Sequence, residues 1–204
     1  MKIRYWMKEH IRNNLWQYLL ITGVFVLGLI IGEINANNLA GGTRSHLQQM
    51  INGFLEGGMV AYHEGNRIFL PAFLNQARTV IAVWFLGLTV IGVPIILAIV
   101  FVRGFSLGFT FGFLIKEKAW LGFLIALLSV LPQNIVYIPL AIACAVIGIN
   151  FSFYIVRGRF TSEVPLAQGI LTYTGIMVLL LLVLLVGALI EAFLSPWLLE
   201  TIIK

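Results

Sequence analysis

Long intervals without a charged side chain constrain this chain more than any other feature. Four of them span at least 20 residues, at 13–32, 79–102, 119–156 and 164–190. Because a helix rises about 1.5 Å per residue, about 20 apolar residues cross the roughly 30 Å hydrocarbon core of a bilayer. The chain is also only 10% charged, against about 25% in soluble domains. The sequence therefore predicts an integral membrane protein and excludes an ordinary soluble domain.

We expect an all-α, polytopic membrane bundle of about five transmembrane helices in a single domain. The interval 119–156 is too long for one crossing, and Pro132 and Pro139 lie near its middle, so it is predicted to form a hairpin of two spans. Pro94 is expected to kink the span at 79–102, in whose middle it lies. The expected segments are a cytoplasmic N-terminus at 1–17, single spans at 18–34, 79–102 and 164–195, and the hairpin at 119–156.

Residues 103–118 do not fit this scheme as a crossing. The 12 residues between Arg103 and Lys116 would reach only about 18 Å as a helix, so we predict a short membrane-embedded or re-entrant segment. Arg103 is then expected at a span end, extending to the cytoplasmic headgroups. Glu33 and Glu191 are expected to reach the headgroups of the opposite side.

The basic residues predict a cytoplasmic N-terminus. On the expected segments, nine of the 13 Lys and Arg residues fall on the side of the N-terminus and four on the other. Cytoplasmic loops of membrane proteins carry such an excess. The basic residues stand singly or in small groups, which is not the patch typical of nucleic-acid binding.

The long loop at 35–78 is predicted to be extracytoplasmic and to contain an amphipathic helix. Apolar residues recur there at steps of three or four, which places them on one helix face; they are Leu47, Met50, Phe54, Gly58 and Ala61. Such a helix can lie on the outer leaflet, cap the bundle or bind a partner. The candidate partner-binding residues of this loop are Leu47, Phe54, Glu56, Tyr62, His63, Arg67 and Phe73.

A ridge of glycines predicts close helix packing. Gly104, Gly108 and Gly112 fall four residues apart, with Phe105 and Phe109 beside them. Small residues at this spacing let another backbone approach in lipid. The ridge can pack within one chain or between the two protomers of a homodimer. A second, weaker pair at the same spacing is Gly28 and Gly32.

A polar helix break is predicted between two prolines, at Pro132, Gln133, Asn134, Tyr137 and Pro139. Proline frees backbone carbonyls that no water satisfies inside a bilayer, and the two carboxamides can donate to them. This favours a structural turn of the hairpin. The alternative is a polar lining for a cavity, or a contact surface for an extracytoplasmic partner.

Few residues could support catalysis or bind a metal. The chain has no Asp, no nucleophile elbow and no phosphate-binding loop, and its one Cys, Cys144, falls inside a predicted span. His63 and Glu64 begin the H-E-x-x-H zinc motif, but Arg67 stands where the second His is required. We therefore expect no enzyme activity, no metal and no cofactor.

Several short segments together resemble the stage II sporulation protein M family. They are Phe73-Leu74-Asn75, Gly92-Val93-Pro94, Arg103-Gly104-Phe105, and Leu131-Pro132-Gln133-Asn134 followed by Tyr137-Ile138-Pro139. No one of them is a strong motif, but their order and spacing carry the resemblance over nearly the whole chain.

The resemblance implies a non-enzymatic membrane scaffold of endospore-forming bacteria, on the mother-cell side of the sporulation septum and required for engulfment of the forespore. The implied partners are sporulation protein P, an amidase-endopeptidase, and through it sporulation protein D, a lytic transglycosylase, which thin the peptidoglycan. The family brings no catalytic residues to transfer. The alternative function is a small transporter or permease-like subunit whose polar cavity lies at the broken hairpin, with Gln133 and Asn134 facing water.

Overall fold

The computed structural model describes residues 9, 11–39, 41–61, 65–161, 166–195 and 197, with the backbone alone for 51, 52, 54–61, 65–68 and 157–161. This described part is helical and contains no strand. Its elements are α2 (Leu15–Asn37), α3 (Gly41–Ala61), α4 (Gly65–Gly87), α5 (Gly92–Ile125), the π-helical turn η1 (Ala126–Val130), α6 (Leu131–Thr161), α7 (Leu166–Leu189) and the π-helical turn η2 (Ile190–Leu194).

Five stretches of the described chain are long and apolar enough to cross a membrane. They are Leu15–Asn37, Phe69–Gly87, Gly92–Ser129, Leu131–Val156 and Leu166–Leu194. The predicted all-α membrane bundle with five long apolar helices is therefore confirmed.

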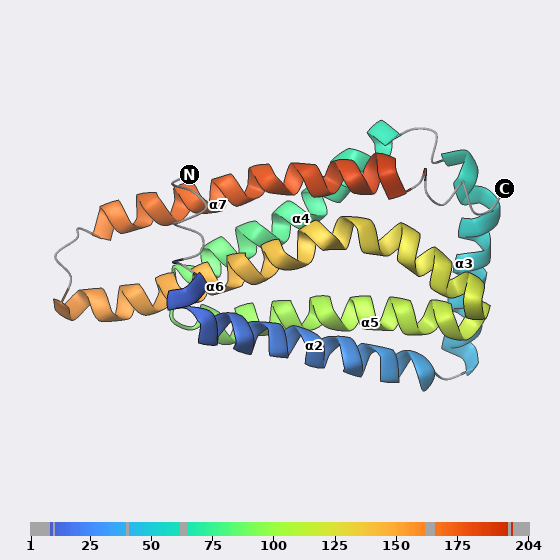
Figure 1. Cartoon of the computed structure of the whole chain (residues 1–204), viewed down its shortest axis with the longest axis horizontal. Helices are drawn as coiled ribbons and strands as arrows, with labels where there is room; N and C mark the ends of the chain where they lie inside the picture. The colour runs from blue at the N-terminus through green and yellow to red at the C-terminus, as the bar shows by residue number, and fades with distance from the viewer. Residues whose placement is uncertain are drawn as a thin grey trace.

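The long helices lie side by side, and α3 runs across one end of the bundle (Figure 1). Helix α2 packs mainly on α5, while α7 packs on α4 and α6. Between them lies an apolar core that includes Ile21, Ile96, Val146, Met177 and Leu184, each at most 2% exposed. Large apolar side chains cover the outer surface, such as Leu179 and Leu182 at 60% exposure each, as expected for helices that face lipid.

Helices α2 and α5 meet backbone to backbone. A Cβ atom added at Gly28 would lie 2.3 Å from the carbonyl oxygen of Phe101, and one at Gly104 would lie 2.1 Å from that of Phe25. At Gly108 the distance to the carbonyl oxygen of Leu29 would be 1.9 Å. We call this contact the glycine seam, formed by Gly28 and Gly32 of α2 and Gly104, Gly108 and Gly112 of α5. The ridge thus packs within the chain.

The expected span at 79–102 is not a single helix. Helix α4 ends at Gly87, residues 88–91 form a turn, and α5 begins at Gly92. Pro94 therefore lies in the first turn of α5 and not in the middle of a span, so its missing N–H breaks no intrahelical bond. Residues 65–78 of the expected outer loop at 35–78 belong to α4. Helix α3 is therefore the one described helix that lies wholly within that loop.

The embedded segment expected at 103–118 is also not observed, because these residues continue α5. The chain turns back at Ala119, whose φ of 46° and ψ of −123° interrupt the helix. Beyond this break, Ile125 and Ala126 pack against Leu114. The crossing therefore extends from Gly92 to about the break at Ala119, with Arg103 inside it.

The hairpin expected at 119–156 is replaced by one helical crossing. After the turn at Ala119 the chain continues through η1 into α6, which runs unbroken from Leu131 to Thr161. Pro132 directly follows the π-helical turn η1, so its missing N–H falls where the regular α-helical bonding is already interrupted, and Pro139 lies inside the helix. Pro132 and Pro139 do not mark the turn, because the chain reverses its direction earlier, at Ala119.

The observed helices change which basic residues lie at each end of the bundle, and the predicted orientation rests on that distribution. The side chain of Lys116 donates a hydrogen bond to the carbonyl oxygen of Asn37, so it lies at the end of the bundle opposite the start of α2. Among the described basic residues, three flank the N-terminal end of the bundle (Arg12, Arg157 and Arg159), four flank the other end (Arg44, Arg67, Lys116 and Lys118), and Arg78 and Arg103 lie within spans. The cytoplasmic N-terminus stays a prediction.

Candidate functional site

A cleft lined by polar side chains opens between α4, α5, α6 and η2 and has a volume of ≈ 500 Å³. We call it the polar cleft. Its polar lining residues are Asn75, Gln76 and Thr79 of α4, Arg103, Ser106 and Thr110 of α5, Gln133, Asn134 and Tyr137 of α6, and Glu191 of η2. Ten polar or charged side chains inside one membrane bundle are expensive, so this is the candidate functional site.

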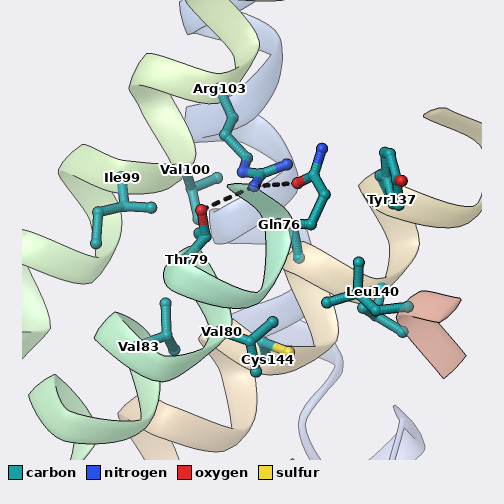
Figure 2. Close-up of a pocket in the computed structure, with 12 residues that line it drawn as sticks. Gln76, Thr79, Val80, Val83, Ile99, Val100, Arg103, Tyr137, Leu140 and Cys144 are labelled. Carbon is teal, nitrogen blue, oxygen red and sulfur yellow. Dashed lines mark hydrogen bonds between the residues drawn. The ribbon is translucent and has the colours of Figure 1, made fainter. Parts of the chain in front are cut away.

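Arg103 lies near the middle of its span. It follows Gly92 by 11 residues and precedes Lys116 by 13, which correspond to about 17 Å and about 20 Å of helix. Its Nη2 donates to Oε1 of Gln76 and to Oγ1 of Thr79 at 2.9 Å. Gln76 and Thr79 are three residues apart on α4 and so share one face. Figure 2 shows the Arg103 side chain reaching across to both acceptors.

Glu191 also lines the cleft, from η2. Tyr137 donates its hydroxyl to Oε2 of Glu191 at 2.9 Å, and Ser195 donates to Oε1 of Gln133 at 2.6 Å. Tyr137 and Gln133 are one helical turn apart and share one face of α6. The two hydrogen bonds made by this face connect α6 to Glu191 of η2 and to Ser195, which follows η2. Glu191 follows the buried Gly187 and Ala188 of α7 by four and three residues, so it continues their inward face.

The two opposite charges of the cleft do not form an ion pair. Among the described residues, the one ion pair joins Arg44 Nε to Glu117 Oε1 at 2.5 Å. Arg103 and Glu191 are instead each held by neutral partners on different helices. The cleft therefore presents a positive pole and a negative pole at once.

Apolar packing closes the bundle beside Arg103. A small void of ≈ 20 Å³ there is lined mainly by aliphatic residues that include Val80, Val83 and Leu140, and by Cys144 (Figure 2). Farther along, the Tyr173 hydroxyl donates to the carbonyl oxygen of Trp84 at 3.0 Å, and the Tyr173 ring stacks on Phe151. In this half of the bundle Trp84 also donates to Oγ1 of Thr174 at 3.1 Å, so these polar side chains bond to the backbone or to each other.

The structure brings part of the predicted polar helix break into the cleft. Gln133, Asn134 and Tyr137 line it, and Asn134 donates to the carbonyl oxygen of Val130 at 2.7 Å. Pro132 and Pro139 do not line it. The carboxamides thus belong to the beginning and first half of one helix, where they face a cleft, and not to a hairpin turn.

Sequence reasoning missed the two charges of the cleft. Arg103 and Glu191 were expected to extend to opposite headgroups, but both face the bundle interior. A signal was present: Gln76 and Thr79 place two hydrogen-bonding side chains on one face of a largely apolar helix, and Arg103 needs such acceptors. The expected segments end at these charges, whereas a charge with internal partners can lie within a span.

The predicted outer-loop residues are divided among several elements. Leu47 lies half-buried on α3. Phe73 belongs to α4, where it packs against the core and stacks on Phe69, so it is not on an outer loop. Phe54, Glu56 and Arg67 are described by their backbone alone, and Tyr62 and His63 lie outside the described residues.

Helix α3 is held against the end of α5. Arg44 and Gln48 of α3 both donate to the carboxylate of Glu117. The Glu117 side chain is only 5% exposed, whereas that of Arg44 is 40% exposed. Beyond these contacts α3 exposes His46, Gln49 and Met50, the last at 59%. These three residues, at successive steps of three and one, form an outer face that we call the α3 face.

Comparison with known proteins gives one result that covers most of the chain. No curated protein and no solved structure matches it. A family model described as Stage II sporulation protein M matches residues 21–196. The chain therefore belongs to the stage II sporulation protein M family.

Proposed function

We propose that this chain is a non-enzymatic membrane scaffold that recruits peptidoglycan hydrolases to the septal membrane while the forespore is engulfed. Family membership makes it a sporulation-related membrane protein, of a family that is not a known enzyme family. The proposed direct partner is sporulation protein P, the amidase-endopeptidase. Sporulation protein D, the lytic transglycosylase, joins through it.

The observation that carries this proposal is the placement of α3. It is a 21-residue helix that lies across the end of the bundle (Figure 1) and is fixed there by Glu117. A helix held in this way offers its outer face at little cost in conformational entropy, which favours binding. We infer that the α3 face lies on the extracytoplasmic side, where a cell-wall hydrolase can reach it.

Substitution of the α3 face tests the proposal. His46, Gln49 and Met50 are replaced together by Ala in the full-length chain, and capture of detergent-solubilised sporulation protein P is measured. We expect capture to weaken at least about tenfold, because a few exposed anchors dominate most interfaces. A matched control replaces the lipid-facing Leu179 and Leu182 by Ala and should leave capture unchanged. Full capture by the α3 variant would contradict a role of the α3 face in binding sporulation protein P.

A small transporter or permease-like subunit is the second candidate, favoured by the polar cleft. Single Cys residues at Gln133 and Asn134, in a Cys144→Ala background, are labelled from each side of the membrane with a water-soluble thiol reagent. Ile135→Cys, at a position 65% exposed on the outer surface of α6, is the lipid-facing control. Labelling of 133 and 134 from both sides, with 135 unreactive, supports transport, while labelling from one side or from neither opposes it.

A further inference from the structure

The two charges of the polar cleft are kept apart by the fold. Charges inside a membrane bundle ordinarily pair with one another, and Arg103 and Glu191 share one cleft. Each is instead fixed by neutral groups, Arg103 by Gln76 and Thr79 and Glu191 by Tyr137. The four helical elements thus hold two opposite poles in one cleft, each on its own neutral partners.

Both poles retain free hydrogen-bonding capacity. A guanidinium has five N–H donors, and within the described residues only its Nη2 has protein acceptors. The Glu191 carboxylate accepts the Tyr137 hydroxyl on Oε2, and its Oε1 has no donor in the described part of the chain. An anionic group can therefore bind Nε and Nη1 of Arg103, and an ammonium can bind Glu191.

The charge pattern selects among ligands. A simple anion would be attracted by Arg103 but repelled by Glu191, and a simple cation would meet the reverse. A neutral molecule would bring no counter-charge to either pole, which leaves two incompletely compensated charges in a site of low dielectric. Only a molecule that carries both charges satisfies both poles.

The volume of the polar cleft suits a small organic molecule. Its ≈ 500 Å³ falls within the range of about 300–1,000 Å³ typical of ligand sites. The cleft has apolar wall at Phe25, Leu107 and Ile138, and carboxamides at Gln133 and Asn134. Such carboxamides can donate to and accept from an amide group.

We propose that the polar cleft binds a small zwitterion with a free ammonium and a free carboxylate, either an amino acid or a short peptide. The carboxylate lies on Arg103 and the ammonium on Glu191. Gln133 and Asn134 bind amide groups between them when the ligand is a peptide. This site goes beyond recruitment of hydrolases and does not depend on it, because none of its residues belongs to the α3 face.

Binding is tested on the full-length chain in lipid nanodiscs with alanine, glutamate, lysine, dialanine and trialanine as probes. Isothermal titration measures affinity, and each probe that binds is compared with its N-acetylated and its C-amidated form. We expect each cap to weaken binding by roughly 10- to 100-fold, the usual effect of losing a hydrogen bond to a charged group. Preference for the single residues or for the two peptides identifies the source of the zwitterion.

Variants assign each pole. In Arg103→Gln the amidated and free-acid forms should bind alike, and in Glu191→Gln the acetylated and free-amine forms should bind alike. Arg78→Gln, at an exposed arginine of α4 outside the cleft, should keep the full preference. Absence of binding by every uncapped probe, or equal binding of capped and uncapped forms, would overturn the proposal. That comparison uses the unaltered chain, so it stands even if a charge variant does not fold.

Discussion

Helix α5 presents two faces with opposite physical properties. On one face Gly104, Gly108 and Gly112 form its side of the glycine seam, where α2 approaches the backbone itself. The other face borders the polar cleft. Its cleft-lining residues stand at positions i, i+3, i+4 and i+7 of the helix and are Arg103, Ser106, Leu107 and Thr110. The seam is stabilised by dispersion contacts between backbones, whereas the cleft is stabilised by a few directed hydrogen bonds.

This difference indicates which part of the bundle is rigid and which part can accommodate a ligand. A seam without side chains has one good geometry, because a Cβ added at Gly28, Gly32, Gly104 or Gly108 would meet a carbonyl oxygen of the other helix. A cleft wall made of long polar side chains can exchange partners between protein, water and ligand. We therefore expect α2 and α5 to behave as one rigid unit, and α4, α6 and η2 to supply the adaptable wall.

The largest expected effect comes from filling the seam. In Gly108→Ala the new Cβ would lie 1.9 Å from the carbonyl oxygen of Leu29, so α2 and α5 must separate, and the free energy of unfolding should fall by about 3 kcal/mol or more. The measurement is unfolding in detergent micelles by a denaturing surfactant. In Gly23→Ala nothing lies within 4 Å of the new atom, so this control should be neutral or slightly stabilising. Equal stability of the two variants would contradict the seam.

A smaller effect is expected from removing an acceptor of the buried guanidinium. Gln76→Leu leaves Nη2 of Arg103 with Thr79 alone and should cost about 2 kcal/mol, within the range for a hydrogen bond to a charged group. The same unfolding assay measures it. Asn75→Leu changes the neighbouring residue on the same wall, which makes no bond to Arg103, and should stay within about 0.5 kcal/mol of the parent chain. If Asn75→Leu proves as costly as Gln76→Leu, the Arg103 contact is not what stabilises this wall.

The smallest effect should appear at α3, outside both regions. Glu117→Gln removes the carboxylate that holds Arg44 and Gln48. Because Arg44 is 40% exposed, solvent screening limits the loss to about 1 kcal/mol, or roughly fivefold in local opening. Hydrogen exchange of residues 41–50 should accelerate by that factor while α2 and α5 keep their protection. Gln49→Ala, at an exposed position of α3, is the control that should not accelerate exchange. Loss of protection in α2 would mean that the seam depends on α3.

The sequence was most informative where one physical rule acts alone. Charge-free length predicted the membrane bundle, and the spacing of Gly104, Gly108 and Gly112 predicted a helix contact, although it left open whether the partner was in the same chain. The predicted segments are wrong where they place a boundary at a charge or a proline. Arg103 is satisfied by Gln76 and Thr79 within a span, Pro94 lies in the first turn of α5, and Pro132 follows η1 within a continuous helical stretch.

The cleft could be predicted only in part. Gln133, Asn134 and Tyr137 stand out as polar residues in an apolar run, and they line it. Arg103 and Glu191 could not be joined to them, because 88 residues separate the two charges along the chain. Only the packing of α4, α5, α6 and η2 brings these residues together.

The two-faced arrangement of α5 is tested most directly by the environment of three spin labels on it. Cys residues at Ala98, Ser106 and Thr110, in a Cys144→Ala background, carry the labels, and their collision rates with oxygen and with a water-soluble nickel complex are compared. Ala98 is exposed on the bundle surface outside the cleft and should be reached by oxygen in lipid and not by nickel, whereas Ser106 and Thr110 should show the higher nickel collision rates. Nickel collision rates as high at Ala98 as at the other two would contradict an Arg103 segment that crosses the membrane.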